Sequence, residues 1–359
     1  MKVLRYSAAL GGIFLVLGAT WIGKELSSPL SPQRGEEAAL LYERETKTEE
    51  ILPITLPHAE LKPVSLFVVG DILLARDVDR RIRLRGEAYP FEKIVDFLKG
   101  HDIVFGNLEG PLVDNAFYVT DWTTRFSFPA QYAALLHSAG FTALNIANNH
   151  IFDVGASGVE QTKSILAANN LKVIGSLSNQ DIFVSLVEIR GRKIGIIGFS
   201  TVRSWLNRET MRQQIEDLAR RSDYTVVTVH WGIEYTPTAR NRERELAEMF
   251  IQAGADVVFG HHPHVVQDVE LINGKPVFYS LGNFLFDQYF RPDTMTGLGI
   301  GIELTEELAR YQMYPLALGY AQPALMGPAE QKQFLNALEQ KSDPELQGKI
   351  SEGNFEVHY

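Results

Sequence analysis

Acidic, amide and imidazole side chains recur in this sequence directly after short apolar runs. The first run ends at Gly70-Asp71, the second leads to Glu109, and the third leads to Asn149-His150. Two later runs end at His230 and at the segment His261-His262-Pro263-His264, so five of the nine histidines lie in three loops. Because the chain has no cysteine, oxygen and imidazole groups are its available metal ligands. The residue types therefore predict a divalent-metal site.

The same residues suit a hydrolytic metal centre. In such a centre a carboxylate bridges two cations about 3.5–4 Å apart, and other oxygen and nitrogen ligands complete their coordination. A separate acid or base serves the leaving group. We expect His150 to be that group and Arg76 to steady an anionic substrate. The expected metal ligands are Asp71, Glu109, Asn149, His230, His262 and His264.

Four nearby residues have two interpretations each. Arg76 suits an anion-binding role and a structural salt bridge equally well, and His261 is either a ligand or a neighbour of the ligand pair. Glu234 either orients an imidazole from behind or lies exposed on the surface. Asn283 is either a turn residue or part of the pocket wall. The sequence alone leaves these alternatives open.

The apolar runs before the polar loops have the length and composition of buried strands. In α/β folds the loops at the carboxyl ends of parallel strands meet at one edge of a sheet, which brings their side chains together. The expected strands span residues 64–70, 102–106, 143–147, 225–230 and 256–259. Amphipathic stretches predict helices over 129–139, 157–169, 209–221 and 239–253, the second with Ser157 as its N-cap.

Antiparallel hairpins interrupt this alternation of strands and helices. Arg190-Gly191-Arg192 separates two apolar runs, and Asn273-Gly274, a strong tight-turn signal, separates two others. A late strand is expected at 298–304 and a last helix at 329–339, and the sequence beyond Asp343 is polar and carries no clear pattern. The fold class is therefore α/β with antiparallel pieces.

The N-terminus carries a membrane-targeting pattern. Lys2 and Arg5 precede Ser7–Gly23, an uncharged run of 17 residues, which as a helix spans about 26 Å, the short limit for a bilayer crossing. A cleaved signal peptide has the same plan, but no A-x-A site follows, so an uncleaved anchor is favoured. We expect a transmembrane segment at 1–24, a flexible linker at 25–62, and the rest of the chain outside the cytoplasm.

The charge balance limits the possible partners. The 359 residues include 34 basic and 44 acidic side chains, a net charge of −10. This balance argues against nucleic acid, because a phosphate backbone calls for a basic surface. The membrane, through the N-terminal helix, remains an expected partner.

Six segments of the sequence, taken together and in order, resemble one known family. They are GDILLAR, NLEGPL, ANNHIFDVGASG, VHWGIEY, GHHPHVVQ and YSLGNFLFD. They are similar to the CapA/PgsA family of poly-γ-glutamate capsule proteins, within the calcineurin-like metallophosphoesterase superfamily. The resemblance implies a sandwich of two mixed β-sheets flanked by helices over residues 63–310, followed by a C-terminal extension at 311–359.

The resemblance also assigns roles to the polar residues. Asp71 resembles the first metal-binding aspartate, Glu109 stands at the bridging acid, and His150 resembles the histidine that helps to protonate a leaving group. The same carry-over gives ligand roles to Asn149, His230, His262 and His264. Two positions depart from the pattern: Leu73 replaces a histidine ligand, and Glu109 is one methylene longer than the usual aspartate. The expected cofactor is one or two divalent cations, with Mn, Zn, Fe and Mg not distinguished.

Two functional hypotheses follow from these observations. In the first, the domain is a metal-dependent hydrolase of a phosphoester or related bond, acting in capsule synthesis or independently of it. In the second, the domain is an accessory protein that works with a membrane synthase on an anionic polymer, poly-γ-glutamate, and binds the polymer without necessarily cleaving it. Carboxylate oxygens are suitable donors to a hard cation in either case.

Overall fold

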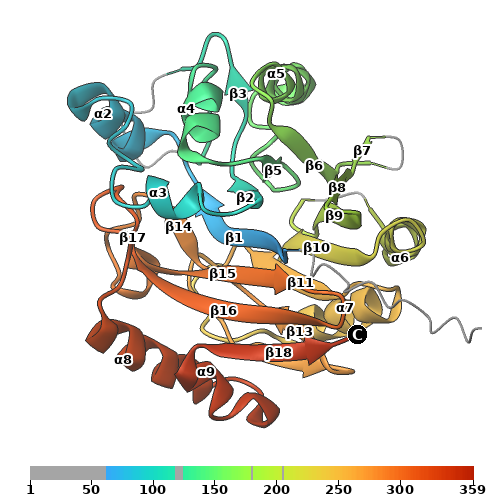
Figure 1. Cartoon of the computed structure of the whole chain (residues 1–359). Helices are drawn as coiled ribbons and strands as arrows, with labels where there is room; N and C mark the ends of the chain where they lie inside the picture. Colours follow the sequence, from blue (N-terminus) through green and yellow to red (C-terminus); the bar gives the residue numbers. More distant parts are fainter. Residues whose placement is uncertain (1–61, 118–123, 179–180, 204–205) are drawn as a thin grey trace, which may run out of the picture. The chain divides into compact units, whose positions relative to one another are not determined.

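The computed structural model describes residues 62–117, 124–178, 181–203 and 206–359. Its larger sheet has ten strands, of which eight form a continuous path and β14 and β18 pair with β1 and β16 (Figure 1). The path runs β17 (Ala324–Leu325), β16 (Leu308–Ala317), β15 (Thr296–Leu304), β1 (Val64–Ile72), β2 (Ile103–Leu108), β5 (Ala143–Asn145), β6 (Lys172–Ser176) and β7 (Ile182–Phe183), with β14 at Asn283–Leu285 and β18 at Asn354–His358. Strands β1, β2, β5 and β6 are parallel, and β15 and β16 are antiparallel, so the sheet is mixed.

The second sheet has six strands and is also mixed. Its order is β12 (Val269–Ile272), β13 (Lys275–Phe278), β11 (Val257–His261), β10 (Tyr224–His230), β9 (Arg192–Ser200) and β8 (Ser185–Ile189). The four strands β13, β11, β10 and β9 are parallel, whereas the two predicted hairpins place β12 and β8 antiparallel at the edges. A small ribbon pairs β3 (Leu112–Val113) with β4 (Phe128–Pro129).

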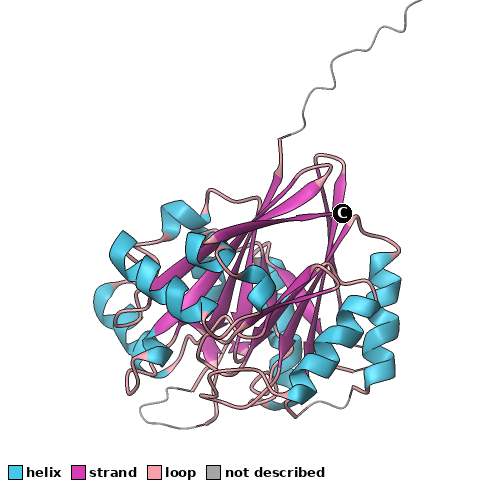
Figure 2. Cartoon of the chain, turned by 90° about the horizontal axis from the view of Figure 1, so that it is seen from below, coloured by secondary structure: helices cyan, strands magenta, loops and turns pink. Residues whose placement is uncertain are grey.

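Helices cover the outer faces of the two sheets, as Figure 2 shows. The helices on the first sheet are α2 (Arg76–Arg85), α3 (Val95–Leu98), α4 (Tyr132–Ala139) and α5 (Gly155–Ala168), and those on the second are α6 (Arg208–Ala219) and α7 (Asn241–Gln252). The C-terminal part adds α8 (Pro328–Glu339), α9 (Lys349–Glu352) and the 3₁₀ turns η1 (Asp293–Met295) and η2 (Pro344–Leu346). Helix α5 begins two residues before the predicted cap, because Gly155 adopts a positive φ of 74° and lets the chain turn into the helix directly after Val154.

Alternation along the strands divides the core into layers. In β1, Leu66 and Val68 face the core between the two sheets, whereas Phe67 and Val69 face the helices. All four are fully buried, and burying one such side chain stabilises the fold by about 1.5–3 kcal/mol. A strand that is apolar on both faces must lie between two layers, which is why the sequence produces a sandwich and not an exposed sheet. The expected sandwich of two mixed sheets flanked by helices is confirmed.

The parallel strands of the two sheets bring their carboxyl ends to the same region. In the first sheet Asp71 is in register with Asn283 on β14 and with Asn107 on β2, which is in turn opposite Asn145 on β5. In the second sheet His230 is in register with His261. The expected meeting of the polar loops is therefore a consequence of strand direction and register.

A close backbone contact fixes the end of β1. A Cβ atom at Gly70 would lie 2.0 Å from the carbonyl oxygen of Gly282, whose own φ is +66°. The Asp71 N–H donates a 3.0 Å hydrogen bond to the same oxygen. Glycine at both positions lets β14 approach β1 directly beside Asp71, so this pair of glycines sets the position of that carboxylate.

Two predicted regions need separate mention. The anchor at 1–24 and the linker at 25–62, apart from Lys62, lie outside the described residues. Among the described residues no helix has the length and hydropathy needed to cross a bilayer. At the other end, the predicted boundary between 310 and 311 falls inside β16, and β18 adds a further strand beside it. The extent of the C-terminal extension as a separate unit stays a prediction.

Candidate metal centre

The Asp71 carboxylate lies fully buried near the end of β1. Asn107 Nδ2 donates a 2.9 Å hydrogen bond to Oδ1, and the His262 backbone N–H donates a 3.2 Å hydrogen bond to Oδ2. The Nδ1 atoms of His261 and His264 lie 3.3 Å from Oδ1 and Oδ2. Burial opposes ionisation, but the two imidazoles outweigh it and lower the pKa of Asp71 well below its usual value. Asp71 is therefore a buried anion that ties the two sheets together.

Glu109, the first residue after β2, directs its carboxylate toward three imidazoles. Its Oε1 lies 3.7 Å from His264 Nε2, 3.9 Å from His150 Nε2 and 4.0 Å from His230 Nε2. These separations are too long for hydrogen bonds, but two ligands of one ion, each about 2.1 Å from it, lie up to about 4.2 Å apart. Oε2 is buried with no hydrogen-bond partner, and burial raises the pKa of Glu109 well above its usual value. A bound cation would satisfy this carboxylate.

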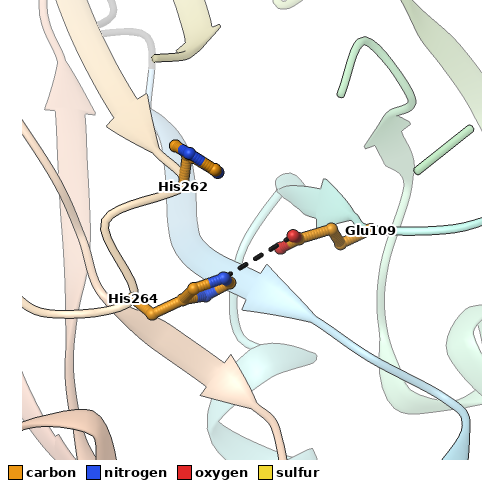
Figure 3. A group of neighbouring side chains, drawn as sticks. All are labelled: Glu109, His262 and His264. Carbon is orange, nitrogen blue, oxygen red and sulfur yellow. Dashed lines mark ion pairs between the residues drawn. The ribbon is translucent and has the colours of Figure 1, made fainter. Parts of the chain in front are cut away.

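His262 and His264 follow β11 in backbone conformations that non-glycine residues rarely adopt. Their φ angles are 94° and 59°, and such residues cost of order 1–3 kcal/mol each. The two turns place both imidazoles near Glu109, as Figure 3 shows. The Nδ1 atom of His262 is buried with no hydrogen-bond partner, so it too is free to bind a cation.

His230 is the last residue of β10, and its imidazole also faces Glu109. Its Nε2 lies 2.7 Å from Asn149 Oδ1, and its Nδ1 lies 3.2 Å from Asn107 Nδ2. Burial, together with the charge of His262, lowers the pKa of His230 well below its usual value. A neutral imidazole is the form that binds metal. Asn149 thus joins the cluster through His230, with its carbonyl oxygen directed inward.

Two overlapping groups of side chains have the spacing of a metal site. Glu109, His262 and His264 form one group, and Asp71, Glu109 and His230 form the other, with all ligand atoms of a group within 4.8 Å of one another. Glu109 belongs to both groups, so it is the carboxylate that could serve two neighbouring cations. The structure brings together all six predicted ligands, and the set of carboxylate, amide and imidazole donors fits one or two divalent cations.

His150 stands beside this cluster, and its Nε2 lies 3.9 Å from Glu109 Oε1. Its Nδ1 lies 2.8 Å from Asp153 Oδ2, and its ring packs against Phe126 with the centroids 4.2 Å apart. Asp153 also accepts a 2.7 Å hydrogen bond from the Phe126 N–H, which fixes the carboxylate. The Asp153 contact assigns the Nδ1 proton and leaves Nε2 facing Glu109. Nε2 is therefore the atom that could exchange a proton with a substrate.

Arg76 makes the structural salt bridge that the sequence left open, and its anion-binding role stays a prediction. It forms a salt bridge with Asp287, and its guanidinium lies over the rings of Phe126 and Phe286 at 5.1 and 5.6 Å. The same side chain lines a cavity beside Glu109, His150 and His264. The ion pair and the two rings hold the guanidinium at the cavity wall, which is the preorganised arrangement that an anion-binding arginine needs.

Comparison with known proteins identifies the family. Residues 65–288 match the family described as bacterial capsule synthesis protein PGA_cap. The chain belongs to this family. It is 30% identical over 310 residues to the PGA biosynthesis protein CapA of Bacillus subtilis (strain 168), which covers 81% of each chain. It is 31% identical over 264 residues to the capsule biosynthesis protein CapA of Bacillus anthracis, which covers 67% of this chain and 64% of that protein.

More distant relatives extend the comparison. A probable polyglutamine synthesis accessory protein of Mycobacterium tuberculosis is 27% identical over 170 residues, which covers 40% of this chain and 44% of that one. Among solved structures, a hypothetical protein from Thermus thermophilus is 16% identical with a TM-score of 0.43, and the match covers 73% of this chain and 96% of that one.

In this PGA_cap family member, His261 and Glu234 lie in different surroundings. His261 is fully buried, its Nε2 lies 2.9 Å from Thr228 Oγ1, and its Nδ1 faces Asp71, so it supports that carboxylate from behind. Within the described part of the chain it joins neither group of metal-spaced side chains. Glu234 is exposed and lines the cavity.

A row of amides beneath the ligands was missed in the sequence. Asn107 donates to Asp71, and its Oδ1 accepts hydrogen bonds from Asn145 at 3.0 Å and Asn148 at 3.1 Å. Asn283 Oδ1 lies 2.9 Å from His264 Nδ1, which places this residue behind a ligand and not in a simple turn. Asn107 and Asn148 follow apolar runs, where asparagine is typical of turns, and Asn145 lies inside one, so no local signal marked these three as neighbours of a ligand, whereas Asn283 was already a candidate for the pocket wall. These amides fix the tautomers and orientations of the ligands.

Proposed function

We propose that this protein acts in the synthesis or export of a poly-γ-glutamate capsule through a metallophosphoesterase-like domain with a divalent-metal hydrolytic centre. The names of the Bacillus relatives and the family match support the biological role. The observation that carries the chemistry is the convergence of six ligand side chains from both sheets, with Glu109 common to the two groups. The buried and unpartnered atoms Glu109 Oε2 and His262 Nδ1 fit the same interpretation.

The ligand set determines what the centre can do. Asp71, Glu109, His230 and His262 would hold the cation or cations, with Asn149 and His264 completing the coordination. A divalent cation bound there supplies Lewis acidity toward a carbonyl or phosphoryl oxygen and makes water a nucleophile near neutral pH.

The remaining residues act on the substrate. Because Asp153 accepts the Nδ1 proton of His150, the Nε2 atom is left to take a proton from the attacking water and to deliver it to a leaving oxygen or nitrogen. Arg76 binds a negative group of the substrate from the cavity wall, held in place by Asp287. The ring of Phe126 covers His150 and limits the access of bulk water to it. Together these residues orient a substrate beside the ligands and protonate its leaving group.

Metal content and turnover test the chemistry. Purified protein should contain a divalent metal in stoichiometric amount, and the variants His262→Ala and His264→Ala should lose most of it while remaining folded by circular dichroism. Loaded with Mn²⁺, the wild type should hydrolyse a phosphodiester or a glutamyl amide, and His262→Ala should not. The hydrolytic proposal fails if fully loaded wild type turns over neither class of substrate.

A second candidate is a non-catalytic accessory protein of a membrane synthase. The printed name of the Mycobacterium tuberculosis relative, a synthesis accessory protein, favours it. In this case the metal centre would bind the polymer through its carboxylates and leave it intact. The two candidates separate in cells: His150→Gln should abolish polymer production if proton transfer is required, and should leave production normal if the site only binds.

The location of the protein is part of the proposal. We infer from Lys2, Arg5 and the apolar run Ser7–Gly23 that an uncleaved helix anchors the chain with its folded domain outside the cytoplasm. Protease added to intact protoplasts should then digest the domain, and membranes should retain the full-length chain after a salt wash. A protected domain, or release of a shortened chain, would contradict this topology.

A further inference from the structure

A cavity of about 270 Å³ opens beside the metal centre and carries both signs of charge. Glu109, His150 and His264 form its inner wall. The remaining wall is largely aromatic, and its lining includes Phe126, Tyr235, Phe286 and Phe290. This volume suits a small substrate or one end of a chain and is too small for a folded partner. The charged side chains of the lining therefore indicate which charged groups such a ligand carries.

The cavity lining carries both an arginine and acidic side chains. Arg76 is the only lysine or arginine among the described lining residues, and it is paired with Asp287. A phosphoester site commonly surrounds its anionic substrate with several cations or hydrogen-bond donors. Here the cavity lining also contributes a second carboxylate, that of Glu234. Such a lining offers a carboxylate to a positive group of a ligand as well as an arginine to a negative one.

Glu234 is held in place by the loop that contains it. The next residue, Tyr235, has a positive φ of 62°, and its N–H donates a 2.8 Å hydrogen bond to the carbonyl of Pro263, between the two histidines of the ligand turn. Tyr235 also accepts a 3.1 Å hydrogen bond from Gln288 Nε2 at the cavity wall. The loop is thus tied to the metal centre. The Tyr235 side chain is also hydrogen-bonded to the Glu234 carboxylate, and among the described residues no ion pair joins that carboxylate to a lysine, arginine or histidine, so it faces the cavity as an exposed acid.

We propose that Glu234 is a specificity-determining residue that binds the ammonium group of a substrate, so that the bond presented to the centre is an amide at the amino end of an acidic peptide chain. The inference rests on the proposed hydrolytic function and specifies its substrate class. Arg76 would bind a carboxylate of the same residue, while Glu234 binds its ammonium group. The two opposite charges on one cavity wall match the two charges of an amino-terminal glutamate.

The reaction is a hydrolysis that consumes one water. The water oxygen bonds to the amide carbonyl carbon, and the C–N bond breaks. The leaving nitrogen takes a proton from His150 Nε2, and the water proton restores that imidazole. The products are a carboxylate on the released residue and a free amine on the shortened chain, so the new chain end again carries the ammonium group that Glu234 binds.

Matched substrates test this inference directly. The probes are synthetic tetramers of γ-linked glutamate, one with a free amino end and one with an acetylated amino end, with products measured by mass spectrometry. Full-length wild type loaded with Mn²⁺ should show a kcat/KM about tenfold or more higher for the free amine, the factor expected of a charge-assisted hydrogen bond. Glu234→Gln, which keeps shape and removes charge, should bring this ratio close to one.

Controls separate failure of this inference from failure of the hydrolytic function. Glu188→Gln makes the same change on the exposed face of β8, outside the cavity, and should keep the wild-type ratio. The metal content of Glu234→Gln should equal that of wild type, and a loss would make Glu234 a ligand and overturn the inference. Equal rates on both tetramers, or cleavage of a phosphodiester alone, would overturn it while the hydrolytic centre stands. If loaded wild type cleaves no tetramer and no phosphodiester, the hydrolytic proposal itself fails.

Discussion

Metal-free protein should lose stability as the pH rises from about 6.5 to about 9. Burial lowers the pKa of His264, but the charges of Glu109 and Asp71 outweigh it and raise this pKa to about 9 from a usual value of 6.5. The folded state therefore holds the proton more tightly than the unfolded state does. A raised folded pKa contributes stability that is complete below the unfolded value and is lost as the pH passes through the folded value.

The size of the effect follows from the His264 shift. A rise from 6.5 to about 9 corresponds to at most about 3 kcal/mol at about 1.4 kcal/mol per unit. A typical domain has a free energy of unfolding of about 5–15 kcal/mol, so a change of this size is readily measured. Below pH 6.5 the free energy of unfolding should instead fall as the pH falls. Burial lowers the pKa of His262 to about 4 and also lowers that of His230, so the unfolded state binds protons at these two residues more readily than the folded state does. Stability of the metal-free protein should therefore be greatest near pH 6.5.

Urea unfolding in the presence of a chelator, at pH 6.5 and pH 9, measures this difference. His264→Gln should remove most of it, whereas His137→Gln, an exposed histidine on α4, should leave it unchanged. Saturating Mn²⁺ should reverse the trend, because the cation displaces the His264 proton and its affinity should rise about tenfold per pH unit between pH 7 and 8.5. Equal stability at the two pH values, or an Mn²⁺ affinity that does not change with pH, would refute the assigned ionisation of His264.

Three further changes probe the parts of the centre. Gly70→Ala should lower the free energy of unfolding by about 3 kcal/mol or more in urea titrations, because its Cβ would lie 2.0 Å from Gly282 O; unchanged unfolding would contradict the close contact of β1 and β14. Glu109→Gln should lower metal content by elemental analysis more than Glu234→Gln does, since Glu109 belongs to both groups of ligands; equal content would exclude a bridging role. Asp153→Asn should leave metal content unchanged and reduce kcat about 10²-fold or more, because His150 loses the partner that fixes its tautomer, and a normal kcat would exclude His150 as the proton donor.

The strands and their polar ends were predictable because their signal is local. Leu66 to Val69 is a continuous apolar run, which indicates a strand buried on both faces, and Asp71 follows it after a glycine. The same reasoning located His230 after β10 and the histidine segment after β11. Strand direction then required these ends to meet, so the centre could be assembled from sequence without any long-range information.

Other features depend on contacts that no local pattern contains. Strand β18 begins at Asn354 in a tail that seemed featureless, although the alternation of Phe355 and Val357 with polar residues matches an edge strand, and pairing with β16 is what selects it. The role of Asn107 depends on register with Asp71 on one side and Asn145 on the other. A sequence shows which residues are amides, but only the assembled sheet shows which of them stand beneath a ligand.

The centre is energetically unfavourable as an arrangement of protein groups alone. Two left-handed histidines cost about 1–3 kcal/mol each, and each buried polar atom without a partner costs about as much again. With Glu109 Oε2 and His262 Nδ1 as those atoms, the sum is of order 4–12 kcal/mol, comparable with the whole stability of a domain. Binding of a structural zinc ion contributes about 10–16 kcal/mol in small metal-dependent domains, which is enough to offset such a cost. The strain at His262 and His264 and the unpartnered atoms beside them are therefore most simply explained together, as a site whose geometry a divalent cation completes.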